Sequence, residues 1–256
     1  MLNDREMQRY ERQMLFAPIG PAGQERLRNC TAVVAGVGAL GSVAASMLTR
    51  AGVGHLRLVD HDRVELSNLQ RQMLYDEEDV QAGRPKVEAA ADRLRRANSD
   101  ITIESHVARI ADDNVSGLVA GADVVIDAVD NFRAKFALNA AALALGIPLV
   151  YGALSGSYGL VAPIVPRRTA CLCCVYREEP DAGSSETAAT AGVIAPVVGM
   201  VASLQVVEAI KLLTGHEREL APGLLQVDAW DYDLSTVSIP RRPDCPACGE
   251  GVATCP

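Results

Sequence analysis

Three glycines and one acid of this chain are spaced as in a nucleotide-binding protein. Gly36, Gly38 and Gly41 form the pattern G-x-G-x-x-G, inside which Ala39 opens an expected helix. Glycine lets the backbone approach a phosphate closely, and a helix N-terminus offers free N–H groups and a positive dipole end. Asp60 follows 19 positions after Gly41, where a carboxylate can bind both ribose hydroxyls. These residues predict a nucleotide site, and an NAD-dependent oxidoreductase fits them equally well.

Further charged residues favour a triphosphate at this site. Arg71 is the last charged residue of the run DHDRVELSNLQRQ, and Lys86 closes GRPK. Two cations suit a triphosphate better than a pyrophosphate that backbone amides already satisfy. Asp130, in DAVDN, offers Mg²⁺ a hard oxygen ligand. A solvated pair of cations and a helix cap at Asp130 are simpler explanations taken singly, but one triphosphate site explains all three residues.

Two pairs of cysteines have the spacing of zinc ligands. Each of the segments CLCC and CPAC contains a C-x-x-C unit, which can supply two sulfurs to one side of a tetrahedral metal. The four expected ligands are Cys171, Cys174, Cys245 and Cys248, whereas Cys173 is expected to point away. A redox C-x-x-C is the rival, but it does not explain a second pair in a Pro/Gly-rich tail. Because four thiolates leave no open position, the zinc should be structural.

The elements that must position these residues alternate between β-branched runs and Ala-rich helical stretches. This alternation predicts an α/β fold, with a Rossmann-like, mainly parallel sheet and helices on both faces. The chain then changes character and predicts an antiparallel C-terminal extension around a long apolar helix, held by the zinc clip. The expected parallel strands are residues 31–35, 56–60, 101–107, 124–127 and 149–152, and residues 157–165 and 225–239 look like antiparallel strands. The expected helices are 39–51, 85–97, 132–145 and 195–213.

We expect one domain over residues 1–256, with an N-terminal helical arm at 1–28 and a nucleotide-binding half at 29–153. Residues 154–256 form the second half. Within it, residues 177–190 contain acids, glycine, serine and proline and almost no bulky apolar residue. Such a segment cannot bury enough surface to order itself, so it is expected to be a mobile loop or crossover.

Composition narrows the class of protein. A hydrophobic content of 49% over 256 residues permits a substantial core, and a net charge of −8 argues against a non-specific nucleic-acid surface. No apolar run approaches the roughly 20 residues of a membrane span, and MLNDREMQRYERQ is too charged for a secretory leader. We therefore expect a cytoplasmic protein that binds neither nucleic acid nor membrane. Of the seven cysteines, Cys30 and Cys255 lack a partner pattern and are expected to be a core residue and a terminal thiol.

In combination, these motifs resemble a known family. GVGALG, DHDRVELSNLQRQ, GRPK, DAVDN, TAGVIAPVVG and the split cysteine pairs are similar to those of the MoeB/ThiF/HesA group, bacterial relatives of the ubiquitin-activating enzymes. The resemblance covers about residues 9–248, nearly the whole chain. The phrase YGALSGSYGL leans toward the thiamine-pathway branch.

The resemblance implies a homodimeric adenylation domain. Such an enzyme uses Mg-ATP to adenylate the C-terminal glycine of a ubiquitin-like sulfur-carrier protein that ends in Gly-Gly, and releases pyrophosphate. Residues 154–256 would then bind the carrier. By motif, Asp60 would bind the ribose and Asp130 would bind Mg²⁺. The other nucleotide-binding residues would be Gly36, Gly38, Ala39, Gly41, Asp62, Asn68, Arg71, Lys86 and Asn131. The catalytic residues would be Arg71, Lys86, Asp130 and Arg12, the last contributed by the neighbouring subunit.

One position departs from the family pattern. Members often carry a cysteine four residues before the glycine of the TAG-type motif, and here that residue is Ala188. Alanine has no nucleophile. Either this chain stops at the acyl-adenylate and a separate sulfurtransferase delivers the sulfur, or a cysteine has been replaced. We expect no thioester or persulfide on this chain.

Two other functions stay open on sequence alone. An NAD-dependent oxidoreductase is favoured only by the glycine loop and Asp60, and lacks an evident hydride-transfer constellation. A non-catalytic, zinc-stabilised scaffold for a ubiquitin-like partner is disfavoured because unpaired charges at residues 60, 71, 86 and 130 destabilise a protein unless a ligand uses them. The sequence does not identify the carrier, its pathway or the sulfur source.

Overall fold

A computed structural model describes residues 1–180 and 190–250 of the chain. Its centre is an eight-stranded sheet in the order β3-β2-β1-β4-β5-β6-β7-β8. Strands β1 to β5 run parallel, and β5 to β8 pair antiparallel. The predicted fold, a Rossmann-like parallel sheet with an antiparallel extension, is therefore confirmed. The strands are β1 Thr31–Ala35, β2 His55–Asp60, β3 Thr102–Val107, β4 Val124–Asp127, β5 Leu149–Ser155, β6 Tyr158–Ile164, β7 Leu224–Asp228 and β8 Asp233–Val237.

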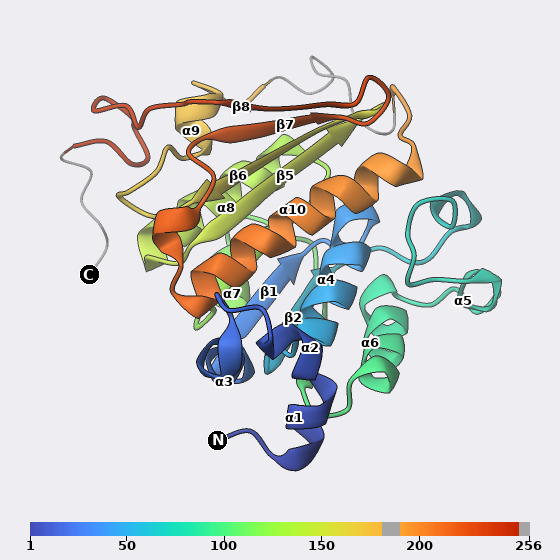
Figure 1. Ribbon diagram of the computed structural model, residues 1–256. Helices are drawn as coiled ribbons and strands as arrows, with labels where there is room; N and C mark the ends of the chain where they lie inside the picture. The colour runs from blue at the N-terminus through green and yellow to red at the C-terminus, as the bar shows by residue number, and fades with distance from the viewer. Residues whose placement is uncertain (181–189, 251–256) are drawn as a thin grey trace.

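Helices cover both faces of this sheet (Figure 1). One hydrophobic cluster joins residues of α4, α6 and α10 to one face, and a second joins residues of α7, α8 and the cysteine-rich segments to the other. The central parallel strands are buried on both sides, which explains why their sequences are continuous apolar runs. The helices are α1 Asp4–Arg9, α2 Glu11–Met14, α3 Gly20–Asn29, α4 Ala39–Ala51, α5 Glu77–Gln81, α6 Lys86–Ala97, α7 Val115–Val119, α8 Phe132–Leu145, α9 Leu172–Val175 and α10 Ala195–Thr214, with 3₁₀ turns η1 Leu66–Asn68 and η2 Glu217–Glu219.

Three of the long helices end at a glycine. α4 stops at Gly52, α8 at Gly146 and α10 at Gly215, and each of these glycines has the left-handed conformation that favours glycine. At Gly52 a side chain would also strike the ring of Tyr10, because an added Cβ would lie 2.5 Å from it. These stops fix where each helix returns the chain to the sheet.

Helix α10 lies across the face of the sheet beside α4 (Figure 1). It has 20 residues and a mean hydropathy of 1.6, so it meets the length and composition of a membrane-spanning helix. By length and composition, the expectation that no apolar run approaches the size of a membrane span is therefore wrong. More than half of its apolar window is buried inside the protein, against α4, β5 and β6. A core helix passes the same test, and α10 packs as one.

The antiparallel half and the arm carry more detail than their sequences predicted. Residues 225–239 were expected to hold antiparallel strands, and they form the hairpin of β7 and β8. The N-terminal arm is helical, as expected, and consists of the three short helices α1 to α3. Most of the expected mobile segment, together with Ala188 and Cys255, lies outside the described residues.

Candidate functional site

The loops that follow β1, β2 and β4 meet at the carboxyl edge of the parallel strands. The N–H of Val37, within the glycine loop, donates to Asp60 Oδ2 at 2.7 Å. Gly36 lies so close to the loop after β4 that an added Cβ would be 2.6 Å from the carbonyl oxygen of Ala128. Gly41 packs even more tightly, because an added Cβ there would strike the carbonyl oxygen of Gly36. Sequence-predicted Gly36, Gly41 and Asp60 therefore form one folded unit.

Gly38 differs from these two glycines. It precedes α4 as the N-cap residue, and an added Cβ would meet only the side-chain amide of Gln72, at 3.6 Å. The first helical residue is Ala39, as the sequence predicted. The N-terminal N–H groups of α4 and this open backbone give the arrangement that binds phosphate groups in other proteins.

A second acid and a cation lie beside Asp60. Asp60 Oδ1 accepts the N–H of Asp62 at 2.9 Å, and Asp62 Oδ2 accepts Lys86 Nζ at 2.9 Å. Lys86 is only 5% exposed, although it begins a helix on the protein surface. The structure thus brings Lys86 to the predicted site and pairs it with a carboxylate.

The segment of residues 66–75 rests on the glycine loop. Tyr75 donates from its hydroxyl to the carbonyl oxygen of Val37 at 2.6 Å, and Gln72 lies beside Gly38. Neither Gln72 nor Tyr75 was singled out from the sequence. Both are buried, and Gln72 Oε1 has no hydrogen-bond partner among the described residues. A ligand-facing role for Gln72 has no sequence signal beyond its place next to Arg71.

Asn68 and Arg71 sit on the same segment and have local partners. Asn68 accepts the N–H of Glu65 with its side chain at 3.2 Å, which closes the turn of η1. The Arg71 guanidinium donates to the carbonyl oxygen of Ser67 at 2.8 Å. The local bond of Arg71 is to a neutral acceptor, so its positive charge is not neutralised by it.

Asp130 and Asn131 follow β4, two and three residues after the Ala128 carbonyl that touches the glycine loop. The side chain of Asn131 accepts the N–H of Ala134 at 2.9 Å and caps α8. The simpler alternative for Asp130, a helix cap, is therefore wrong, because Asn131 has that role. Asp130 is exposed and accepts a long hydrogen bond of 3.4 Å from Asn131 Nδ2. Its carboxylate is accessible to a cation.

A buried ion pair between α8 and the end of β4 lies at this edge of the sheet, and it was not predicted from the sequence. Lys135 Nζ donates to Asp127 Oδ1 at 3.0 Å and to the carbonyl oxygen of Gly152 at 2.6 Å. Asp127 is fully buried, and this burial raises the pKa of its carboxyl despite the nearby ammonium. From the other face, Gln205 Nε2 donates to the carbonyl oxygens of Asp127 and Val150. The only signal was a lysine among apolar residues of a helix.

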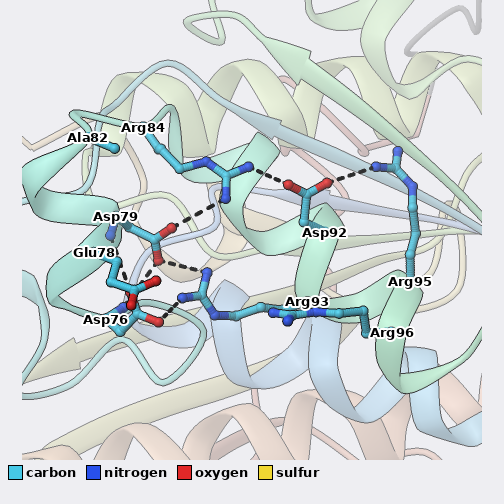
Figure 2. A pocket seen from close by; sticks show the side chains of 9 residues that line it. All are labelled: Asp76, Glu78, Asp79, Ala82, Arg84, Asp92, Arg93, Arg95 and Arg96. Carbon is cyan, nitrogen blue, oxygen red and sulfur yellow. Dashed lines mark hydrogen bonds and ion pairs between the residues drawn. The ribbon is translucent and has the colours of Figure 1, made fainter.

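A surface cavity of about 690 Å³ lies between the α5 region and α6 (Figure 2). Arg93 pairs with Asp76 and with Asp79, the latter at 2.7 Å, and Asp92 lies between Arg84 and Arg95. The lining holds four acids and four arginines, so its charges balance without a ligand. The lining residues are Asp76, Glu78, Asp79, Ala82, Arg84, Asp92, Arg93, Arg95 and Arg96. We interpret this network as a support for the chain that leads into Lys86.

The structure does not bring Arg12 to the site of its own chain. Its neighbour Gln13 donates to the carbonyl oxygen of Ala51, at the C-terminal end of α4, whereas the glycine loop is at the N-terminal end. Thirteen helical residues separate the two ends by about 20 Å. Within residues 1–180 and 190–250, the exposed Arg12 guanidinium has no hydrogen bond or ion pair.

The four predicted zinc ligands gather into one buried cluster. Cys171 Sγ and Cys245 Sγ are 3.6 Å apart, and Cys174 Sγ and Cys248 Sγ are 3.5 Å apart. All four sulfurs lie within 4.8 Å of one another. Cys173 is outside the cluster, and its sulfur accepts a hydrogen bond from Asn139 Nδ2 at 3.8 Å. The sequence-based choice of Cys171, Cys174, Cys245 and Cys248 is thereby supported.

The geometry of the cluster suits a metal ion. Four sulfurs at the usual zinc distance of about 2.3 Å stand about 3.8 Å apart in a tetrahedron, close to the separations here. The Arg242 N–H donates to Cys174 Sγ at 3.5 Å, as outer-shell amides do for ligand sulfurs. Burial opposes ionisation of Cys245, but backbone N–H groups of Ala247 and Cys248 lower the pKa of its thiol to about 7. The residues therefore fit zinc.

A Rossmann-type sheet whose glycine loop is hydrogen-bonded to a strand-end carboxylate is the architecture of nucleotide-binding proteins, and the separate cluster of four thiols is compatible with a structural metal. The ThiF family model matches residues 10–247, nearly the whole chain. The protein therefore belongs to the ThiF family, as the motifs predicted.

Individual relatives agree with this assignment. A protein named sulfur carrier protein ThiS adenylyltransferase, from Bacillus subtilis, is 47% identical over 243 residues, which cover 94% of this chain and 71% of that protein. The SAMP-activating enzyme E1 of Haloferax volcanii is 42% identical over 98% of this chain and 92% of its own. In solved structures, Escherichia coli MccB with ATP aligns with a TM-score of 0.81 over 94% of this chain and 74% of its own. That match is 23% identical and supports the fold alone.

Proposed function

We propose that this protein uses Mg-ATP to adenylate the C-terminal glycine of a ubiquitin-like sulfur-carrier protein. The oxygen of the carrier carboxylate would attack the α-phosphorus of ATP, and the bond from that phosphorus to the β-phosphate oxygen would break. The products would be an acyl-adenylate and pyrophosphate. The relatives named above are adenylyltransferases and activating enzymes, which supports the reaction class.

The observation that carries this proposal is the convergence of three loops on one glycine-rich helix N-terminus. Hydrogen bonds link Val37 to Asp60, Asp60 to Asp62, and Asp62 to Lys86. The acid proposed to bind the ribose and the cation proposed to bind the phosphates therefore belong to one hydrogen-bond network. A pyrophosphate-binding dehydrogenase has no need for the buried cation. The geometry therefore favours a triphosphate over NAD.

Each charged residue would have a distinct role. Lys86 and Arg71 would neutralise charge that develops on the departing pyrophosphate, and Asp130 would hold Mg²⁺ on the phosphates. Because the carrier carboxylate is already ionised, the reaction needs positioning and electrostatic stabilisation more than a general base. We also propose that Asn68 and Asn131 line the nucleotide site, although Asn68 closes the turn of η1 and Asn131 caps α8.

The carrier would dock on the antiparallel half. Large apolar side chains are exposed on β6, on β8 and in the turn between β7 and β8, which is unusual for surfaces without a partner. They are Tyr158, Trp230, Tyr232, Leu234 and Val237. A ubiquitin-like domain held there could direct its extended tail along the sheet edge toward Asp130.

A second copy of the chain would complete the site. Arg12 is exposed and unpaired in the described residues, and its neighbour Gln13 contacts the end of α4 opposite the glycine loop, so we propose that Arg12 acts on a neighbouring site. Mixed dimers test this. An Arg12→Ala chain combined with a Lys86→Ala chain should regain activity, because one of the two sites then has both cations. No recovery in dimers of verified composition would contradict the shared site.

Sulfur chemistry would fall to another protein. Ala188 offers no thiol at the position where family members often have one. We propose that the acyl-adenylate is released to a separate sulfurtransferase in the cytoplasm. A carrier adduct that survives denaturation and is cleaved by thiols would contradict this.

The direct test is ATP–pyrophosphate exchange with purified carriers ending in Gly-Gly. A ThiS-type carrier is the first candidate, because of the relative named for it. Exchange that requires the carrier and its terminal glycine supports the proposal. Binding of ATP without exchange for any Gly-Gly carrier would favour a scaffold, and stabilisation by NAD instead of ATP would favour an oxidoreductase.

A further inference from the structure

Two acids, Asp60 and Asp62, lie in the nucleotide site, and both were predicted to bind the nucleotide. We infer that Asp62 acts as a positioning residue, holding the Lys86 ammonium in place for the triphosphate rather than binding the ribose. This inference rests on the proposed function. On this inference Asp60 serves the ribose end of ATP, and Asp62 serves the triphosphate end by holding Lys86.

The contacts of Asp62 run to Lys86 through both backbone and side chain. Lys86 N donates to the Asp62 carbonyl oxygen at 2.9 Å, and Lys86 Nζ donates to Asp62 Oδ2 at 2.9 Å. The flanking residues continue the pairing, since Val64 N donates to the Arg84 carbonyl oxygen and Arg63 forms an antiparallel bridge with Pro85. The segments around residues 62–64 and 84–86 are thus joined edge to edge.

Asp60 has different surroundings. Its two oxygens accept the N–H groups of Val37 and Asp62, which ties the glycine loop to the turn after β2. The Asp60 side chain is 8% exposed, whereas the Asp62 side chain is 48% exposed. The second carboxylate oxygen of Asp62, Oδ1, lies 3.3 Å from His61 Nε2. Asp60 is therefore fixed by backbone N–H groups, whereas Asp62 contacts the Lys86 ammonium.

The charge state of Asp62 agrees with this role. Partial burial opposes its ionisation, but the hydrogen bond and charge of Lys86 prevail and lower the pKa of the carboxyl. An ionised carboxylate keeps a nearly buried ammonium at a fixed position. Within the described residues, Asp62 is the one acid paired with Lys86.

Holding Lys86 would matter because a lysine side chain is otherwise mobile. Ordering such a side chain costs conformational entropy. An ammonium has three N–H donors, so one bond to Asp62 leaves two for phosphate oxygens. With Lys86 already ordered, ATP binding would not have to order it, and the benefit would grow with the number of phosphates.

Binding measurements on a graded set of nucleotides test the inference. In Asp62→Asn, calorimetric affinity for Mg-ATP should fall roughly tenfold, the effect of one hydrogen bond to a charged group, while affinity for AMP should change less than about twofold. Asp62→Ala should behave alike. If Asp62 binds the ribose instead, ATP and AMP will weaken equally, and the preference for ATP over 2′,3′-dideoxy-ATP will disappear.

A double-mutant cycle supplies the second arm. Because Asp62 would act through Lys86, Asp62→Asn should add almost nothing to the loss of ATP affinity in Lys86→Ala. Additive losses would overturn the inference. Glu88→Gln, which removes one exposed negative charge from the same helix, is the matched control and should bind ATP normally. If the unaltered protein bound no ATP, the proposed function itself would fail, and the two failures are thereby distinguishable.

Discussion

The carboxyl edge of the parallel strands, here called the nucleotide edge, and the cysteine cluster both gather reactive side chains, but they differ in whether those side chains have partners within the protein. At the cysteine cluster, four thiols turn inward, are buried and lie within 4.8 Å of one another. At the nucleotide edge, Arg71 and Asp130 have only weak or neutral local partners, and the backbone at Gly38 is open. The first arrangement satisfies its own groups once a metal is bound. The second leaves charge to be used by a ligand.

The difference teaches where the protein sacrifices stability for function. Charges left without partners reduce stability, and they persist where a ligand needs them. The nucleotide edge tolerates this because a closed pair, Asp127 and Lys135, and the balanced network around Arg93 hold the surrounding chain. Charged residues proposed to act on a ligand and charged residues that stabilise the fold therefore lie close together. Substitutions of the first kind should mainly lower activity, and substitutions of the second kind should mainly lower stability.

The largest expected effect comes from the closed pair at the nucleotide edge. Lys135→Met leaves Asp127 buried without its partner, so the free energy of unfolding should fall by about 3–5 kcal/mol. Urea unfolding measures it. Replacing both residues, as Asp127→Leu with Lys135→Met, should recover much of the loss. A cost below about 1 kcal/mol for the single change would mean that this pair is not structural.

Arg71→Ala should lower activity and leave stability almost unchanged, in contrast to Lys135→Met. Its loss removes transition-state charge stabilisation, so carrier-dependent ATP–pyrophosphate exchange should fall about 10²- to 10³-fold. The melting temperature should hardly change, because the one bond lost is to the Ser67 carbonyl. Arg218→Ala, an exposed arginine of η2, is the control. Unchanged exchange in Arg71→Ala would remove this residue from the mechanism.

At the cysteine cluster, Cys248→Ser should affect stability and leave nucleotide binding alone. Loss of a ligand should abolish stoichiometric zinc, measured by mass spectrometry, and lower the melting temperature by about 5–10 °C. ATP affinity measured below the transition should stay within about threefold. Cys173→Ser, a thiol outside the cluster, should keep its zinc. A parallel loss of ATP affinity in Cys248→Ser would show that the two regions are coupled.

The smallest expected effect concerns Gly38, which should differ from Gly41 in whether an added methyl group lowers ATP affinity or stability. Gly38→Ala adds a methyl that meets only the Gln72 amide, so the fold should tolerate it, while ATP affinity should fall roughly tenfold because the methyl occupies the phosphate approach. Gly41→Ala places its methyl against the Gly36 carbonyl and should destabilise the fold instead. Equal effects of the two changes on melting temperature would refute this distinction.

Much of the fold and of the candidate site could be predicted because its signals are short-range. Alternation of apolar runs indicated the strands and helices, and β1, α4, β4 and α8 have the predicted bounds. The glycine loop, the strand-end Asp60 and the C-x-x-C pairs depend on spacing over a few residues, which a linear sequence contains in full. The parallel direction of the first strands followed from the same pattern, since a helix between two strands serves as the crossover that parallel pairing needs.

Only the tertiary structure decided which groups meet across the sheet. Lys86 joins Asp62 and not Asp60, Lys135 reaches Asp127, and Gln72 lies beside Gly38. It also placed Arg12 at the far end of α4 from the glycine loop. The physical reason is that these contacts depend on the order of the strands and on the rotation of each helix. Neighbouring positions in the sequence carry no record of either, so the sequence determined the types of groups and the fold determined their partners.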